Sequence, residues 1–348
     1  MGDSPIGSYF EQPAPEFLLD APPLPHWHGQ QTRFFALGRH ALAQAAQELI
    51  ARDVKLIHLP DFLCSSMLAP FERFMAWRLY PLTEDLLPET GALDLLGQGD
   101  AVLVCNFFGR DIPSGVVESI RAARARGATV VSDLTHAPFE PAPWRDDLTI
   151  ISLRKTLPIP DGAIIMGHLL CDPPVVEGLS PDALDVRSAA AREKYSAARD
   201  GGNTASASQA LSDFERYLET VATPAPMSDH SITALASLDT EALARARIRN
   251  AATIVRLLND LDGLSPLPGY GSQLAPAYVT CRTAHPRELQ TSLARQGVYC
   301  PIHWPRPTQL DNLAWRNDLI SLPIDHRYDS HDMERIARCA RQHFQERK

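Results

Sequence analysis

SDLTHAPFEPAPWRDDLTIISLRKTLPIPDGA, residues 132–163, contains the ends of two apolar runs that each lead to a reactive side chain. The first run ends at Asp133, and the second, LTIISL, leads to Arg154 and Lys155. A carboxylate at one strand end and a lysine past the next suit a covalently bound pyridoxal phosphate (PLP). The carboxylate would keep the pyridine nitrogen protonated, and the lysine would form the Schiff base. Arg154 would point to the opposite face if the strand continued, so we interpret it as structural.

Lysine is rare in this chain, and its rarity makes the position of Lys155 informative. The sequence has four lysines, and the 33 basic residues minus these four leave 29 arginines. Arginine stays protonated and cannot form an imine, whereas lysine can. A lysine kept at a strand end therefore indicates a chemical role, with chance retention as the alternative.

Strands and helices alternate on the N-terminal side of this stretch. Apolar runs at 55–62, 77–82 and 99–109 are typical of strands, and residues 34–52 and 111–127 are typical of helices. This alternation predicts a mostly parallel sheet in an α/β domain, whose ligands bind outside the carboxyl ends of the strands. Phe62, Asn106, Asp133 and Lys155 all follow apolar runs in that position.

Gly38 precedes the apolar positions of the first predicted helix. A glycine there lets the backbone amides of Gly38, Arg39 and His40 approach an anion such as a phosphate. An ordinary helix cap is the alternative interpretation.

The bulk composition narrows the class of protein. A length of 348 residues favours about two domains, and the net charge of −9 argues against a nucleic-acid partner. We expect no membrane span, because no apolar run reaches roughly 18 residues, and the first residues lack a secretory signal pattern. A cytoplasmic protein is therefore expected. The six cysteines show no CxxC spacing, so we expect free buried thiols and no metal site.

The pattern divides the chain into three parts. Residues 1–30 are rich in proline and aromatic residues and are predicted to form an extended arm. We expect a large cofactor-binding α/β domain at 31–235, with surface helices after residue 175. A linking helix and a small C-terminal α+β domain are expected at 236–348.

These motifs, in this order, resemble those of the fold-type-I PLP enzymes, and among them the DegT-type sugar aminotransferase family. The resemblance covers roughly residues 33–345 and rests on GRHAL, LPDFLC, CNFFG, SDLTHA, SLRK, DGA, MSDHSITAL, RIRNA, PIHWP and LISLPIDHRYDSHDMERI. It implies a large domain with a mostly parallel seven-stranded sheet and a small C-terminal domain. It also implies a homodimer whose active sites are shared between subunits.

The resemblance also implies roles for individual residues. Lys155 would hold PLP as an aldimine, and Asp133 would form a salt bridge with the pyridinium nitrogen. His136 would lie near the phenolic oxygen or over the ring. Ser152 would bind the phosphate together with the amides of Gly38 and Arg39.

The sequence departs from the family pattern in places that concern the substrate. The position that usually stacks on the ring falls on Cys64, with Phe62 two residues earlier. A clean Gly-x-Asn-x-Arg motif, which reaches the partner's site in the family, is missing, and Ser228 and Ser231 are candidates to replace it. We therefore interpret the chain as a divergent member.

Three residues near the C-terminus are candidate substrate contacts. His303 is either a substrate-facing group or a packed loop residue. His326 and Arg327 either bind an anionic substrate or form a solvated surface pair.

The resemblance predicts an aminotransferase that uses an amino acid donor, glutamate in most of the family. The acceptor would be a keto-sugar nucleotide or another small carbonyl compound. A PLP enzyme of another class, catalysing elimination or epimerisation, is one alternative, although Lys155 argues against the family's dehydratase branch. A non-enzymatic protein on a retained fold is the other.

Overall fold

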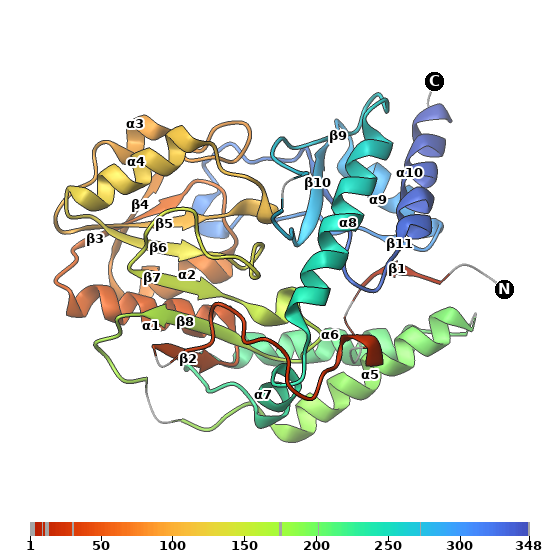
Figure 1. Ribbon diagram of the computed structural model, residues 1–348, viewed down its shortest axis with the longest axis horizontal. Helices are drawn as coiled ribbons and strands as arrows, with labels where there is room; N and C mark the ends of the chain where they lie inside the picture. Colours follow the sequence, from red (N-terminus) through yellow and green to blue (C-terminus); the bar gives the residue numbers. More distant parts are fainter. Residues whose placement is uncertain are drawn as a thin grey trace.

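The computed structural model describes residues 4–8, 10, 14–29, 31–173, 176–200, 202–271 and 273–346, without the side chains of 198 and 199. A seven-stranded sheet lies on one side of the molecule and a smaller sheet on the other, and a long helix starts beside the large domain and runs along the smaller sheet (Figure 1).

The large sheet has the predicted, mostly parallel arrangement. Its strands lie in the order β2 (Thr32–Phe35), β8 (Ala163–Gly167), β7 (Leu148–Ile151), β6 (Thr129–Asp133), β5 (Asp100–Cys105), β3 (Leu56–Pro60) and β4 (Ala76–Tyr80). β3 to β7 pair in parallel, whereas β8 is antiparallel to both of its neighbours. The parallel strands therefore end at a common edge.

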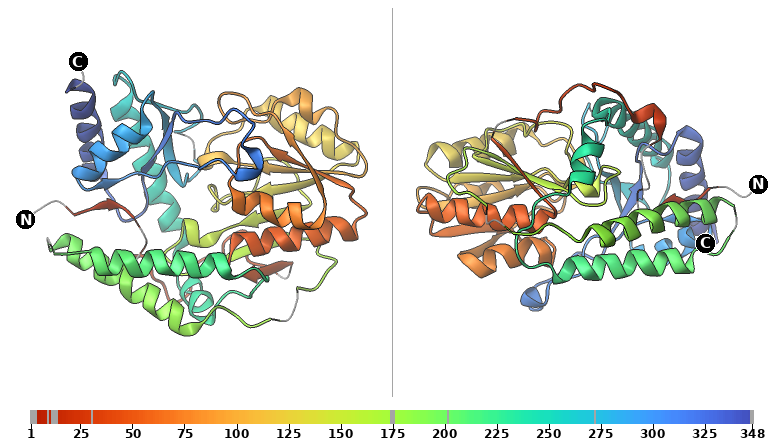
Figure 2. Two further views of the ribbon diagram at one scale, coloured as in Figure 1. Left: turned by 180° about the vertical axis from the view of Figure 1, so that it is seen from behind. Right: turned by 90° about the horizontal axis from the view of Figure 1, so that it is seen from below.

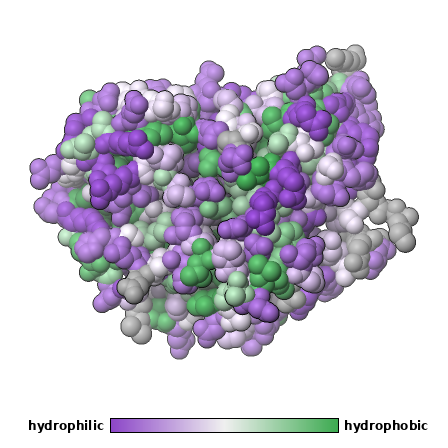
Figure 3. All heavy atoms as spheres, viewed as in Figure 1, coloured by the Kyte–Doolittle hydropathy of each residue, from purple (hydrophilic) through white to green (hydrophobic). Residues whose placement is uncertain are grey.

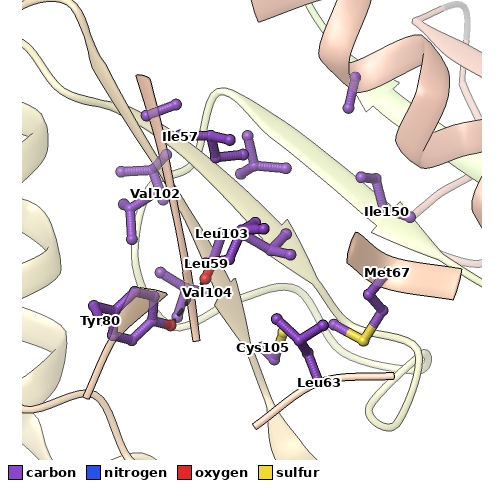
Figure 4. Packing of buried hydrophobic residues seen from close by; sticks show 14 of the residues in the cluster. Ile57, Leu59, Leu63, Met67, Tyr80, Val102, Leu103, Val104, Cys105 and Ile150 are labelled. Carbon is purple, nitrogen blue, oxygen red and sulfur yellow. Dashed lines mark hydrogen bonds between the residues drawn. The ribbon is translucent and has the colours of Figure 1, made fainter. Parts of the chain in front are cut away.

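Burial explains why these segments are strands. Every residue of β7 and nearly all of β5 and β6 are buried, as expected for parallel strands covered on both faces. Side chains from β3, β5 and α2, including Ile57, Val102 and Met67, meet in this core (Figure 4). The helices around it are α1 (Gly38–Ala51), α2 (Ser65–Phe74), α3 (Thr90–Leu93) and α4 (Ser114–Ala125).

The smaller sheet belongs to the C-terminal part of the chain. β10 (Tyr278–Arg282) pairs antiparallel with β12 (Leu319–Pro323) and β9 (Ser265–Pro266), and β11 (Val298–Tyr299) lies apart from them. α9 (Pro286–Arg295) and α10 (Ser330–Gln345) pack with this sheet. α7 (Asp229–Leu235) precedes α8 (Thr240–Leu258), the long helix that runs along the smaller sheet (Figure 1). The predicted boundary at residue 235 falls between α7 and α8 and stays a prediction.

The N-terminal segment ties the two parts together. β1 (Ile6–Gly7) pairs in parallel with β11, and Ile6 is buried in the core of the small sheet. Gly7 has a φ of +92°, and a Cβ there would lie 2.2 Å from the Tyr299 carbonyl oxygen, so only glycine fits. After η1 (Pro15–Phe17), Leu18 forms a bridge with Leu238, so the segment continues along the start of α8.

Two surface helices form a hairpin beneath both parts. α5 (Pro181–Arg199) and α6 (Ala205–Thr220) run alongside each other, as Figure 2 shows. α6 buries Leu211, Phe214 and Leu218 at helical spacing, so one face packs inward. None of the helices described is both long and apolar enough to span a bilayer. The face seen in Figure 3 is mainly hydrophilic, with scattered apolar residues.

Candidate functional site

The predicted reactive residues lie along the carboxyl edge of the large sheet. β6 ends at Asp133, and β7 is followed by η3 (Leu153–Lys155). The parallel register pairs Asp133 with Ile150 of β7, so the two strands end side by side. Because both ends lie at one edge, Asp133 and Lys155 share the region that the sequence predicted.

Thr135 links these two strand ends, and the sequence analysis missed it. Its backbone N–H donates to Asp133 Oδ1 at 2.9 Å, and its hydroxyl accepts from the Ser152 N–H at 3.0 Å. An aspartate side chain often accepts the backbone N–H two residues on, so Asp133 in SDLTHA already indicated this turn, although not the bond from the Thr135 hydroxyl to Ser152.

Asp133 is a buried carboxylate that lacks a cationic partner. Its exposed fraction is 9%, and no cation pairs with it among the residues described here. Burial raises the pKa of the carboxyl group, although the hydrogen bonds from Thr135 oppose the shift. A buried charge without a partner is costly, so this carboxylate suits a cation placed at the strand ends.

His136 is held as a neutral imidazole. Its Nδ1 accepts the Phe108 N–H at 3.2 Å, which leaves Nε2–H as a donor. Its ring stacks on Phe108 and on Trp304, with centroids 5.1 and 5.8 Å away. Burial, followed by the charge of Lys155, lowers the pKa of His136 to about 3. The imidazole can therefore donate a hydrogen bond without carrying a charge.

Lys155 is an amine inside a cavity, and its ionisation is strongly perturbed. Its side chain is exposed to the cavity while protein surrounds it. The adjacent Arg154 charge, followed by desolvation, lowers the pKa of Lys155 to about 8, and Glu215 opposes this shift. Arg154 does not point away as predicted, because β7 ends at Ile151 and strand alternation no longer applies. It lines the cavity instead and pairs with Glu215.

The start of α1 lies against Ser152. A Cβ on Gly38 would be 3.1 Å from Ser152 Cβ and 3.2 Å from Ser152 Oγ, so a side chain would crowd this contact. The N-terminus of a helix attracts anions through its amides and dipole. The Ser152 hydroxyl and the first turn of α1 therefore form a cradle suited to a phosphate.

His40 is used in another way than predicted. Its amide donates to the Leu37 carbonyl at 3.0 Å, and its ring contacts the Val221 carbonyl and the Ala225 N–H at 3.1 and 3.2 Å. His40 thus anchors the chain after α6, and of the three predicted amides those of Gly38 and Arg39 remain candidates.

Three other predicted cofactor contacts lie around the site. Phe62 is buried among Phe107, Trp304 and Trp315, so it belongs to an aromatic cluster. Asn106 Oδ1 accepts the Arg110 N–H at 3.1 Å and shapes the turn at η2 (Phe107–Gly109). Cys64 stands at the N-cap of α2, close enough to Lys155 to influence its pKa.

The predicted substrate contacts separate into two places. His303 lies beside His136, with ring centroids 5.6 Å apart, and its Nδ1 is 3.0 Å from Ser321 Oγ. His326 and Arg327 are not a solvated pair, because His326 is 6% exposed and stacks on Phe10. Arg327 binds both oxygens of Asp325, at 2.8 and 3.0 Å.

Ser228 and Ser231, the candidates to replace the missing motif, bond a carboxylate of their own chain. Their hydroxyls donate to Asp161 Oδ1 at 2.6 and 2.5 Å. They therefore satisfy a fully buried carboxylate from the DGA motif.

A cavity of about 650 Å³ lies next to Lys155, and most of its wall was not predicted. The large domain contributes Arg154 and Lys155, and the helical hairpin contributes Arg187 and Glu215. The remaining lining residues come from the N-terminal segment, α8 and the small domain, and include Gly7, Ser8, Phe10, Arg247, Tyr278, Tyr299 and Asp325. No group of His, Cys, Asp or Glu able to hold a metal occurs in the described part of the chain.

The residues at the strand ends fit a bound PLP. Asp133 offers an unpaired carboxylate for a pyridinium nitrogen, and Lys155 offers an amine for the aldehyde. Gly38 carries no side chain to crowd Ser152, so the first turn of α1 and the Ser152 hydroxyl suit the phosphate.

Comparisons with known proteins support the fold. No family model and no curated protein matches the sequence. The aminotransferase TlmJ from Streptoalloteichus hindustanus aligns with a TM-score of 0.61 at 16% identity, over 91% of this chain and 87% of that one. Spr1654 from Streptococcus pneumoniae, a proposed sugar aminotransferase, aligns in its PLP form with a TM-score of 0.60 at 13% identity, over 90% of this chain and 87% of that one. Its PMP form gives a TM-score of 0.60 at 12% identity, over 90% and 86%.

A third structure carries the name of the resembled family. A DegT DnrJ EryC1 StrS aminotransferase from Brucella abortus gives a TM-score of 0.57 at 13% identity, over 89% of this chain and 85% of that one. At such identities the similarity defines the fold. The chain therefore has the fold of the fold-type-I PLP transferases, and the resemblance to the DegT-type aminotransferases is confirmed at the level of the fold.

Proposed function

We propose that this protein is a PLP-dependent aminotransferase. The observation that carries the proposal is that two reactive groups follow neighbouring strands. Asp133, a buried carboxylate without a cationic partner among the described residues, ends one strand, and the Lys155 amine follows the end of the next. When bound, PLP supplies an electron sink for a carbanion at the substrate's α-carbon. The fold supports this assignment, because its structural neighbours are aminotransferases.

The residues of the site suit the proton transfers of this reaction. Asp133 would hold a proton at the pyridine nitrogen of the cofactor. The carboxylate and the protonated pyridine would then neutralise each other, so no net charge would be buried. The Lys155 amine, with a pKa of about 8, is neutral roughly 300-fold more often at pH 7 than an ordinary lysine. It can therefore act as nucleophile and as the base that moves the substrate's α-proton. His136 would donate a hydrogen bond from its Nε2–H and would add no charge to the site.

The identities of the substrates are further proposals. Glutamate is the proposed donor, and the acceptor is a keto-sugar nucleotide or another small carbonyl compound. We also propose a homodimer with shared active sites, from the family resemblance, and a cytoplasmic location, as expected from the bulk features of the sequence.

The cofactor claim is tested by the visible spectrum of the full-length protein incubated with PLP. We expect a yellow absorption band that is lost in Lys155→Ala and kept in Lys55→Ala. Lys55 is a matched control, because its side chain is 74% exposed and pairs only with Asp53 among the described residues. A protein that stays colourless, or a band unchanged in Lys155→Ala, would contradict the proposal.

The reaction class is tested by adding glutamate to the yellow protein. Bleaching of the band with release of 2-oxoglutarate supports transamination, whereas bleaching without a keto acid favours elimination or another class. If no amino acid changes the spectrum, the aminotransferase assignment is wrong. Keto-sugar nucleotides and keto acids can then be compared as acceptors by recovery of the band.

A further inference from the structure

The α6 helix places one carboxylate next to the reactive end of η3. Glu215 accepts two hydrogen bonds from Arg154, Nη1 to Oε1 at 3.0 Å and Nη2 to Oε2 at 3.2 Å. Both side chains line the cavity that contains Lys155, and Arg154 directly precedes Lys155. A two-point contact fixes the plane of the guanidinium as well as its distance. Glu215 therefore fixes the place of the Arg154 charge, which has the largest effect on the Lys155 amine.

We propose that Glu215 is a positioning residue: through its two-point contact with Arg154, it determines how readily the Lys155 amine releases its proton. The inference rests on the proposed function, in which that amine is the reacting group. It connects the α5–α6 hairpin, about 60 residues farther along the chain, to the chemistry at the strand ends.

The amine is surrounded by charged and titratable groups from several elements. These are Arg154 of η3, Glu215 of α6, Arg39 of α1, Cys64 before α2, and His136 and His303 of two loops. Arg187 of α5, which also acts on Glu215, Arg247 of α8, Tyr278 of β10 and Asp325 line the same cavity. Both histidines have pKa values lowered by burial, so they are neutral near pH 7. The balance at the amine is thus set mainly by the cation of Arg154 and the anion of Glu215.

The sign of each effect follows from this balance. Arg154 is the largest cause of the low pKa of Lys155, and Glu215 counteracts it. Removing the Glu215 charge leaves Arg154 unopposed, so the pKa of Lys155 falls further. Removing the Arg154 charge leaves Glu215 unopposed, so the pKa of Lys155 rises.

Chemical labelling of the full-length protein freed of PLP tests this proposal. The rate at which acetic anhydride acetylates Lys155 is measured against pH by mass spectrometry of the peptide. Because the chain has four lysines, the peptide that contains Lys155 can be identified without ambiguity. The exposed Lys55 serves as the internal reference for the labelling rate. We expect the pH midpoint of Lys155 acetylation to fall by about half a pH unit in Glu215→Gln. The same midpoint should rise by at least as much in Arg154→Gln.

Asp213→Asn is the matched control. Asp213 is exposed on α6 and bonds only Gln209 and Arg216 among the described residues. The pH midpoint of Lys155 acetylation in this variant should therefore equal that of the parent protein. A Glu215→Gln midpoint that is unchanged or raised overturns the proposal. If Glu215→Gln does not fold by circular dichroism, Arg154→Gln decides, and an unchanged or lowered midpoint overturns it. Labelling requires no cofactor, so this outcome is independent of the PLP absorption test.

Discussion

The strand-end residues of the site and the wall of the cavity differ in how the chain builds them. We call Asp133, His136, Ser152 and Lys155 the floor of the site, because they follow two adjacent parallel strands, and Lys155 is the one among them that lines the cavity. We call Phe10, Arg187, Glu215 and Tyr299 the wall, because they come from the N-terminal segment, the hairpin and the small domain. The floor depends on a topological rule for strand ends, whereas the wall depends on packing between distant segments.

This difference separates what each region does. The floor holds the groups that suit a cofactor, and short local contacts such as those of Thr135 fix it. The wall encloses the space for a substrate and modulates the floor through the pair of Arg154 and Glu215. Substitutions in the floor should therefore affect cofactor binding and the catalytic rate. Substitutions in the wall should affect the stability of the fold and the pKa of the Lys155 amine.

Asp133→Asn should have the largest effect on activity. Asparagine keeps the shape but cannot hold a proton on a pyridine nitrogen, so transamination should slow by about 100-fold or more. Thermal unfolding of the cofactor-free protein should show an equal or higher Tm, because the substitution removes an unpaired buried charge. A Tm that falls together with the activity would indicate a structural role instead.

Asp146→Asn provides the comparison for this change. Asp146 is also a partly buried carboxyl group with a raised pKa, but it precedes β7 at the opposite end of the strand and bonds Thr149 at 2.5 Å. It should lose some stability and keep the catalytic rate. If both variants lose activity alike, the distinction between the floor and the rest of the sheet is not supported.

The floor was largely predictable from the sequence, and the wall was not. Asp133 and Lys155 end apolar runs, and alternating strands and helices bring such ends to one edge. The fold class followed from the same pattern and the motif order. The pairing of Arg154 with Glu215 depends on how α6 packs, and no spacing in the sequence encodes it.

The wrong assignments have a common physical cause. The predicted His40 amide donates to the nearby Leu37 carbonyl, whereas the His40 ring and the Ser228 hydroxyl bond groups far along the chain. His40 contacts the backbone at 221 and 225, and Ser228 bonds Asp161. Tertiary partners of polar side chains cannot be read from local pattern, and Arg154 was misplaced because its strand ended earlier than expected.

Gly38→Ala should have an intermediate effect, confined to the floor. The new Cβ would crowd Ser152 at 3.1 to 3.2 Å, so we expect the Kd for PLP to rise about 10-fold in a spectroscopic titration. The unfolding free energy should change little, because alanine is tolerated in a helix. Gly115→Ala, also in the first turn of its helix but with open space around it, should bind PLP like the parent. Equal affinities for both variants would remove Gly38 from the phosphate cradle.

Phe10→Ala should have the smallest effect, and it isolates the wall. Phe10 stacks on His326 and supports the Arg327 guanidinium 4.6 Å from its ring centroid, so its loss should cost about 1 kcal/mol at pH 7. Burial lowers the pKa of His326 to about 3, although Asp325 opposes this shift. The unfolded chain takes up a proton below pH 6.5 that the folded His326 refuses, so stability falls as the pH decreases toward 3.

Exposing the imidazole in Phe10→Ala should raise the pKa of His326 and flatten this acid slope. The change can reach about 1.4 kcal/mol per pH unit, the value for one proton, in urea unfolding measured between pH 7 and 4. Leu24→Ala, at a side chain of the same segment that is 71% exposed, should keep the parental slope. The PLP absorption band should be unchanged in both variants, because the floor is untouched. A parental slope in Phe10→Ala would show that Phe17, whose ring centroid lies 5.1 Å from that of His326, and the small-domain packing bury His326 without Phe10. A lost band would show that the wall supports the floor directly.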